Sequence, residues 1–204
     1  MASGLRERKK AETRRALASA ALRLARELGP DGVTVEAIAE AAGVSPRTFF
    51  NYFASKDDAI VNISPTEQSM LLADLCDRPE DEPPLDALRA MVQAAAARFA
   101  EDADEMLVRH RLAQEHPSLA MRRSARFAEV ERALAEEIAR RTGLDVDADT
   151  YPALVVAAAL GALRVATAVW NETGRTRPLP ELVDQAFDQL AAGLNRAAAP
   201  ASPA

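Results

Sequence analysis

The chain has 204 residues, of which 49% are apolar and 27% charged, a balance ordinary for a protein that buries a core. Its single cysteine, Cys76, excludes an intrachain disulfide and fits a reducing compartment such as the cytoplasm. The net charge of −6 is unevenly spread: residues 1–60 hold ten Lys or Arg against eight Asp or Glu, whereas the remaining 144 hold fifteen against twenty-three.

The chain begins with a basic segment that leads into an amphipathic helix. Apolar residues recur every three or four positions from Leu17 to Leu28, which predicts a helix over residues 8–28. Residues 1–6 before it are expected to be disordered. Six Lys or Arg against two Glu in the first fifteen residues form a basic arm, which stands out on an acidic protein.

Two short helices separated by a glycine turn come next. Thr34 can cap a helix over residues 35–41, and Gly43 can end it in the left-handed conformation. Ser45 caps a third helix, with Pro46 at its first position. This order is typical of the helix-turn-helix, whose second helix enters the DNA major groove. Helix pairs with a glycine turn also occur in ordinary bundles, so the pattern alone leaves DNA binding open.

The rest of the chain predicts only helices. Ser55 can cap a helix over residues 56–75, in which Ser64-Pro65 marks a kink or a restart. Further amphipathic or apolar segments predict helices over residues 85–100, 102–114, 118–142, 149–170 and 181–194. Neither a strand nor an internal repeat is visible. The predicted fold class is therefore all-α.

The longest apolar run, residues 151–170, is long enough on paper to cross a bilayer. Arg164 interrupts it, and alanine supplies much of it. We therefore interpret it as a helix packed inside the protein and expect no membrane association.

Motifs of catalysis and metal binding are not visible in the sequence. The two histidines, His110 and His116, lie six residues apart and do not share a helix face, as zinc ligands would. No glycine-rich phosphate loop or nucleophile motif accompanies them. We expect neither an enzyme nor a bound metal or cofactor.

A specific family resemblance extends over about the first sixty residues. Residues 34–58, TVEAIAEAAGVSPRTFFNYFASKDD, resemble the TetR (tetracycline-repressor-like) family of bacterial transcription regulators through the motif VxxIAxxAGVSxxTFFxYFxSK. Thr13, Ala16, Ala21 to Leu24 and Gly29 add to the match. The resemblance implies a helix-turn-helix DNA-binding domain at residues 7–54, a helical ligand-binding and dimerisation domain at 55–196, and a disordered tail at 197–204.

The resemblance also implies which residues contact DNA. Base contacts are expected at Pro46 and Arg47, and an arginine can donate two hydrogen bonds to guanine. Asn51 lies on the same side of the helix. The positions expected to grip phosphates are Thr34, Thr48, Tyr52 and Lys56. The basic arm, residues 6–15, is expected along the DNA backbone or in the minor groove.

The aromatic residues of the recognition helix divide into two groups. Phe49 and Phe53 are expected in the core, where they lock the helix in place. Phe50 stands where the family usually has a tyrosine; it can either meet a thymine methyl group or pack inward, and we favour the DNA contact.

Partners follow from the same resemblance. Helix-turn-helix proteins bind palindromic double-stranded operators as dimers. We predict a homodimer through residues 151–170 and 181–194, which form a four-helix bundle across the dimer in the family. Purely intrachain packing of residues 151–170 is the alternative.

A small-molecule effector pocket is expected among the helices from residue 85 to residue 170. The C-terminal half is similar to actinobacterial members with an acyl-CoA-like ligand-binding domain, through EHPSL and RTGLDVDADTYPALVVAAALGALRVA. The candidate lining residues, each of which can also be plain core, are Phe99, Met106, Leu107, His110, Phe127, Arg164 and Trp170. Arg164 must pair with a carboxylate, reach the surface or meet an anionic ligand.

The predicted function is a cytoplasmic, ligand-responsive, homodimeric transcription regulator, in the family's usual mode a repressor released by a small hydrophobic or acyl-type effector. The alternative is a helical ligand-binding or protein-interaction module without sequence-specific DNA binding. Arg47, Lys56 and the basic arm favour the regulator, whereas the net acidity and the missing tyrosine at Phe50 favour the module.

Overall fold

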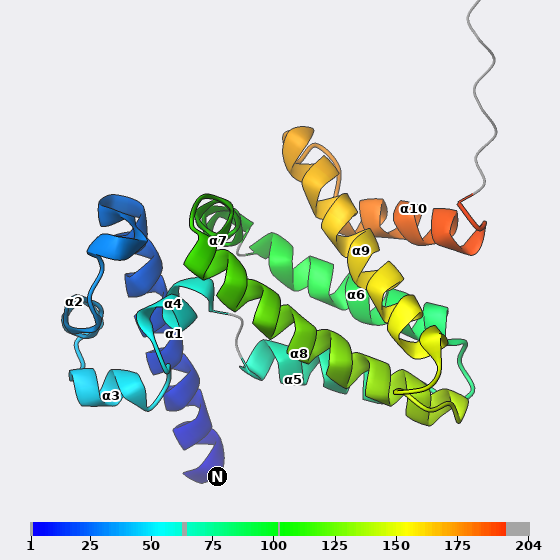
Figure 1. Cartoon of the computed structure of the whole chain (residues 1–204), viewed down its shortest axis with the longest axis horizontal. Coiled ribbons are helices and arrows are strands. Elements are labelled where there is room, and N and C mark those ends of the chain that lie inside the picture. The colour runs from blue at the N-terminus through cyan, green and yellow to red at the C-terminus, as the bar shows by residue number, and fades with distance from the viewer. Residues whose placement is uncertain (1, 63–64, 102, 195–204) are drawn as a thin grey trace, which may run out of the picture. The chain divides into compact units, whose positions relative to one another are not determined.

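The computed structural model describes residues 2–62, 65–101 and 103–194, and within these ranges the chain forms ten helices and no strand (Figure 1). The predicted all-α fold class is confirmed. The helices are α1 (Ala2–Gly32), α2 (Val35–Ala41), α3 (Pro46–Phe50), α4 (Lys56–Val61), α5 (Pro65–Cys76), α6 (Pro84–Glu101), α7 (Ala103–Glu115), α8 (Pro117–Thr142), α9 (Thr150–Glu172) and α10 (Leu179–Ala191).

One predicted helix boundary was wrong, and one predicted break is confirmed. Helix α1 begins at Ala2 instead of residue 8, so residues 2–6, expected to be disordered, are helical. Of the kink or restart predicted at Ser64-Pro65, the structure has the restart: Asn62 ends α4 in the left-handed conformation, and Pro65 begins α5. The tail predicted at residues 197–204 lies outside the described residues.

Close contacts divide the chain into two compact units. Unit 1 comprises Met1–Gln68 and Asp102–Glu129, and unit 2 comprises Ser69–Glu101 and Val130–Ala204. This division differs from the boundary predicted after residue 54, because α4 packs on α1 and α7 inside unit 1.

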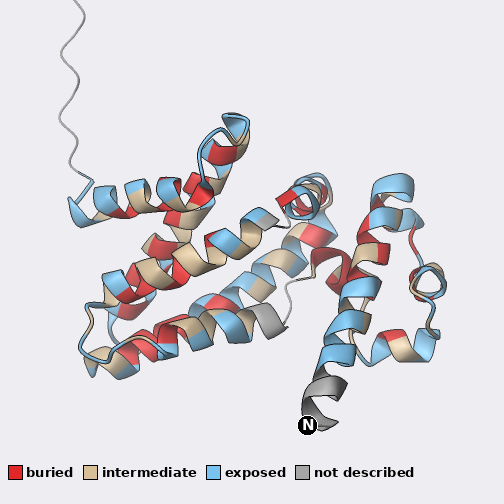
Figure 2. Cartoon of the chain, turned by 180° about the vertical axis from the view of Figure 1, so that it is seen from behind, coloured by how far each residue is buried: buried red, intermediate tan, exposed pale blue. Residues whose placement is uncertain are grey.

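Unit 1 is built around the second half of α1. Residues 8–16 of α1 are exposed or half-buried, and the buried residues of this helix begin at Leu17 (Figure 2). The buried face of α1 packs against α2, α4 and α7. The largest side chains of this core are Leu17, Ile38, Phe49, Ile60 and Leu119. The helix-turn-helix therefore packs against a single contiguous core.

Unit 2 is held together by α6, α9 and α10, which pack pairwise. One face of α9, with Val155, Val156 and Ala159, is buried. Arg89 of α6 forms ion pairs with Asp184 at 2.6 Å and Asp188 at 2.8 Å, which join α6 to α10.

The opposite face of α9 is apolar but exposed. Tyr151, Leu154, Val165 and Val169 lie on it, with Leu154 65% exposed. Among the described residues, α9 is long and apolar enough to cross a membrane by length and composition alone. Its packing against α6 and α10 fits a helix of a globular unit.

A buried carboxylate organises the end of α8. Glu137 accepts hydrogen bonds from Arg140 Nε at 2.8 Å and from Arg141 Nε at 2.9 Å. Arg141 in turn donates to the carbonyl oxygens of Leu75, Arg78 and Pro79, where α5 ends. The Arg140 and Arg141 guanidinium groups lower the pKa of Glu137 from 4.5 to about 2.

This shift predicts an acid-sensitive contribution to folding. The folded-state pKa of Glu137 is depressed, so the stabilisation is present above the unfolded value near 4.5 and is lost as pH falls towards 2. Glu137→Gln should lower the free energy of unfolding at pH 7 by about 2 kcal/mol in urea titrations. The difference between wild type and variant should shrink between pH 4.5 and 2.

The matched control is Glu136→Gln. Glu136 is exposed and pairs with Arg132, so its loss should cost less than about 1 kcal/mol. A Glu137→Gln deficit that stays constant from pH 7 to pH 2 would show that the carboxylate charge does not stabilise the fold.

Candidate nucleic-acid interface

The turn between α2 and α3 is a Schellman motif. Val44 N–H donates to the Ala39 carbonyl at 2.9 Å, and Gly43 N–H donates to the Glu40 carbonyl at 3.0 Å. Gly43 has φ 68°, the left-handed conformation predicted for it. These two hydrogen bonds satisfy carbonyl groups at the end of α2 that would otherwise lack a partner. They also fix the direction in which α3 leaves the turn.

Helix α3 has only five residues, and its sequence defines where it begins. Ser45 Oγ accepts from Thr48 N–H at 3.1 Å, and Pro46 occupies the first helical position. Phe49 is 0% exposed, and Phe53 just beyond the helix is also buried, which confirms the prediction that both are core residues.

The side of α3 opposite Phe49 is exposed. Arg47, Phe50 and Asn51 are all exposed and have the i, i+3, i+4 spacing of one helix face, with Pro46 at its start. Phe50 is 59% exposed and meets Phe49 edge-on at a centroid distance of 5.4 Å. Phe50 therefore does not pack inward, so the inward-packing alternative for its ring is excluded.

The two predicted phosphate-gripping threonines take part in the hydrogen bonds at the starts of α2 and α3. Thr34 Oγ1 accepts from Ala37 N–H at 3.1 Å at the start of α2. The hydroxyls of Thr48 and Ser45 share a hydrogen bond of 2.9 Å. Thr34 is exposed and Thr48 is half-buried. Because a hydroxyl both accepts and donates, the Thr34 O–H still has a proton to donate.

The other two predicted phosphate contacts, Tyr52 and Lys56, are both partly buried. Tyr52 is half-buried against the core of unit 1. Lys56 is also half-buried, and its ammonium donates to the carbonyl oxygens of Pro30, Asp31 and Val33. In the free protein Lys56 thus binds backbone at the end of α1.

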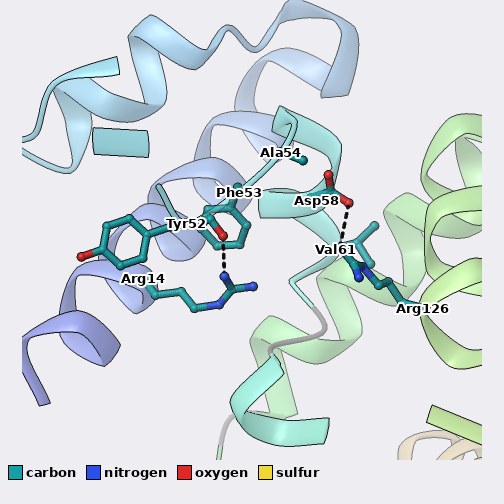
Figure 3. A pocket seen from close by; sticks show the side chains of 7 residues that line it. All are labelled: Arg14, Tyr52, Phe53, Ala54, Asp58, Val61 and Arg126. Atoms are coloured by element: carbon teal, nitrogen blue, oxygen red, sulfur yellow. Dashed lines mark hydrogen bonds and ion pairs between the residues drawn. The ribbon is translucent and has the colours of Figure 1, made fainter. Parts of the chain in front are cut away.

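Arg14, placed by prediction in the DNA-binding arm, points into unit 1. Its guanidinium donates to the Tyr52 carbonyl at 2.6 Å and lies 4.1 Å from the centroid of the Phe53 ring (Figure 3). The arm that remains exposed on α1 carries Arg8, Lys9, Lys10 and Arg15. Arg14 instead fixes the chain where it leaves α3.

Helix α4 is held by two arginines from later helices. Arg109 of α7, 8% exposed, donates to the Ile60 carbonyl at 2.6 Å and to Glu105 at 3.0 Å. Arg126 of α8 lies 3.9 Å from Asp58, whose backbone N–H bonds to Ser55 at the start of α4 (Figure 3). Sequence reasoning missed Arg109, although it lies three and four residues before the buried Leu112 and Ala113 and thus on the buried stripe of its helix.

A small pocket lies between these groups. It encloses about 60 Å³ and is lined by Arg14, Tyr52, Phe53, Ala54, Asp58, Val61 and Arg126 (Figure 3). Pockets for drug-sized ligands are typically about 300–1,000 Å³, so this one is too small for an acyl chain. None of the predicted effector residues lines it.

The predicted effector residues are divided between the two units. His110 and Phe127 of unit 1 are joined by Arg123, which bonds to His110 Nδ1 at 2.6 Å and lies 5.5 Å from the Phe127 ring centroid. Desolvation and the Arg123 charge lower the pKa of His110. Met106 and Leu107 lie on α7 in the same unit, whereas Phe99, Arg164 and Trp170 belong to unit 2.

The structure defines the surroundings of two unit 2 candidates, Arg164 and Trp170. Arg164 is exposed, so it reaches the surface of unit 2. Trp170 is buried, its indole N–H donates to the Arg177 carbonyl at 2.8 Å, and Arg175 lies 5.1 Å from its ring centroid. Trp170 therefore holds the connection from α9 to α10.

The architecture and the exposed face of α3 define the class: a helix-turn-helix DNA-binding regulator with a second, helical domain. Family models match both parts, "Bacterial regulatory proteins, tetR family" over residues 17–60 and "MftR C-terminal domain" over residues 82–195. The chain belongs to the TetR family of bacterial transcription regulators.

Similar proteins support this assignment. The HTH-type transcriptional regulator TcmR of Streptomyces glaucescens is 38% identical over 174 residues, 82% of this chain and 76% of that protein. The transcriptional regulator MftR of Mycobacterium tuberculosis is 30% identical over 190 residues, 93% and 94% of the two chains. Among solved structures, the Thermus thermophilus repressor FadR in complex with lauroyl-CoA has a TM-score of 0.59 at 23% identity, over 94% of this chain and 100% of that one.

Proposed function

We propose that the chain is a homodimeric transcriptional repressor that binds a palindromic operator and leaves it when an acyl-type effector binds. The observation that carries the DNA part is the exposed face of α3, with Arg47, Phe50 and Asn51 held outward by the buried Phe49. Such a regulator acts on the chromosome in the bacterial cytoplasm.

Each group on this face has a distinct expected role. Arg47, in the first turn of α3, donates to guanine O6 and N7. The exposed Phe50 ring meets a thymine methyl group, because a phenyl ring has no donor for phosphate. Pro46 and Asn51 complete the reading face, and the hydroxyls of Thr34, Thr48 and Tyr52 position it on phosphates.

The distribution of charge along the chain supports the same orientation of the protein on DNA. The exposed basic residues of α1 provide the sequence-independent attraction to phosphate that grows as salt is lowered. The net negative charge of residues 61–204 keeps the remainder of the protein away from DNA.

The exposed apolar face of α9 supports the dimer. Tyr151, Leu154, Val165 and Val169 recur at helical spacing, and Gly161 between them carries no side chain to hold a facing helix away. A two-fold pairing of this face with itself, completed by α10, would cover it.

The acyl-type effector is supported by two comparisons. The C-terminal match is to the MftR C-terminal domain, and the T. thermophilus FadR of similar fold is in complex with lauroyl-CoA. We propose the predicted effector residues as candidate contacts within each unit: Met106, Leu107, His110 and Phe127 in unit 1, and Phe99, Arg164 and Trp170 in unit 2.

The repressor proposal predicts specific binding to DNA upstream of the protein's own gene. In gel-shift titrations the wild type should prefer this DNA over random sequence, and Arg47→Ala should lose about 1–3 kcal/mol of that discrimination. Lys9→Met, in the exposed arm, should weaken both DNAs alike and lower the salt slope by about 0.9. Lauroyl-CoA, but not coenzyme A alone, should release the bound DNA.

Three outcomes would contradict parts of this proposal. If the wild type shows no preference at any salt concentration, the alternative of a helical module without sequence-specific DNA binding holds. If Arg47→Ala weakens both DNAs equally, Arg47 contacts backbone and not a base. If lauroyl-CoA leaves the complex intact, lauroyl-CoA is not an effector.

The dimer proposal predicts that a charge on the α9 face separates the subunits. Light scattering after size exclusion should give a dimer for the wild type and a monomer for Leu154→Glu, because a buried unpaired carboxylate is strongly unfavourable. Met121→Glu, which also replaces an exposed apolar residue but on α8, should remain a dimer. A dimeric Leu154→Glu protein would place the interface elsewhere.

A further inference from the structure

Lys56, the first residue of α4, lies where three backbone carbonyl groups converge. Its Nζ donates to Pro30 O at 2.9 Å, to Val33 O at 2.9 Å and to Asp31 O at 3.3 Å. Pro30 and Asp31 lie in the short helical turn that follows Gly29, where α1 is interrupted by a φ of 72°, and Val33 follows this turn. The side chain thus joins segments that are 23 to 26 residues apart in sequence.

The hydrogen-bonding capacity of the Lys56 ammonium is fully used in this contact. A lysine ammonium has three N–H donors and no acceptor, and each donor has a carbonyl partner here. Carbonyl groups at a helix C-terminus lack intrahelical partners and carry partial negative charge, so a cation suits them. A DNA phosphate could bind Lys56 only by displacing one of these carbonyls.

The segments that Lys56 joins lie on either side of the helix-turn-helix. Val33 directly precedes Thr34, which caps α2, and Ser55, which caps α4, directly precedes Lys56. The Lys56 side chain therefore closes a ring that contains α2, the Gly43 turn and α3. The position of α2 against α1, and with it the direction of α3, depends on this closure.

We propose that Lys56 is a positioning residue that sets the orientation of the helix-turn-helix, and not a phosphate ligand. The proposal rests on the DNA-binding function proposed above. It predicts that the geometry of the ammonium, and not only its charge, is required at this position.

Two substitutions separate the roles. Arginine binds phosphate at least as well as lysine, but its planar fork cannot direct three donors at carbonyls grouped around one nitrogen. Methionine keeps an unbranched stem and removes the charge. A phosphate ligand would tolerate Lys56→Arg and not Lys56→Met, whereas the positioning role tolerates neither.

The experiment measures DNA binding for both variants at a temperature where circular dichroism shows them fully folded. We expect Lys56→Arg and Lys56→Met each to lose about tenfold or more in affinity for the preferred DNA, since hydrogen bonds from a charged group are lost. Affinity for random DNA and the salt slope should stay close to wild type. Lys9→Met, the exposed control, should keep the ratio of preferred to random binding.

Wild-type affinity in Lys56→Arg, together with a slope reduced by about 0.9 in Lys56→Met, would overturn the proposal in favour of a phosphate contact. Wild-type binding by both variants would also overturn it. A merely stabilising role would lower the unfolding temperature and leave the binding of the folded protein unchanged.

Hydrogen exchange provides a test independent of DNA. The Ala37 and Ile38 amides, which bond to Thr34 at the start of α2, should exchange about tenfold faster in both variants, while amides of α9 are unchanged. Unchanged α2 exchange would overturn the positioning role even if the wild type proves to have no preferred DNA. A wild type without preference but with faster α2 exchange in the variants would reject the DNA function alone.

Discussion

The burial of Phe49 is the constraint on which the reading face depends. Five residues are far fewer than an isolated helix needs to form in water, so α3 has no stability of its own. Phe49 is fully buried and packs beside Phe53 at a centroid distance of 5.7 Å. Removing such a side chain from water is worth about 1.5–3 kcal/mol, and it leaves Arg47, Phe50 and Asn51 on the outside by helical geometry alone.

A second feature recurs in the structure: cations bind the carbonyl ends of helices in place of solvent. Lys56 does so at α1, Arg109 at α4, Arg14 just beyond α3, and Arg141 of unit 2 at α5. Each joins a helix end to a segment distant in sequence, where the partial negative charge of unpaired carbonyls favours a positive group. Basic residues in this chain therefore serve the fold as well as DNA, and counting them overstates the phosphate contacts.

Local rules predicted most of the fold. Apolar periodicity, the caps Thr34 and Ser45 and the left-handed Gly43 gave α2 to the residue, because these signals act within one or two turns. The partners of Lys56 and Arg14 were not predictable, since they depend on which distant segments meet. Residue type alone does not distinguish a side chain that lines a pocket from one that bonds to a loop, as Trp170 does.

Helix α3 presents its face only as part of the core of unit 1. Native-state hydrogen exchange tests this directly at the Tyr52 and Phe53 amides, which donate to the Phe49 carbonyl at 2.9 and 3.1 Å. If α3 is held by this core, these amides should open with a free energy within about 1 kcal/mol of the α1 amides around Leu17 and Ala21. Much faster exchange at Tyr52 and Phe53, with α1 still protected, would show that α3 opens independently of the core.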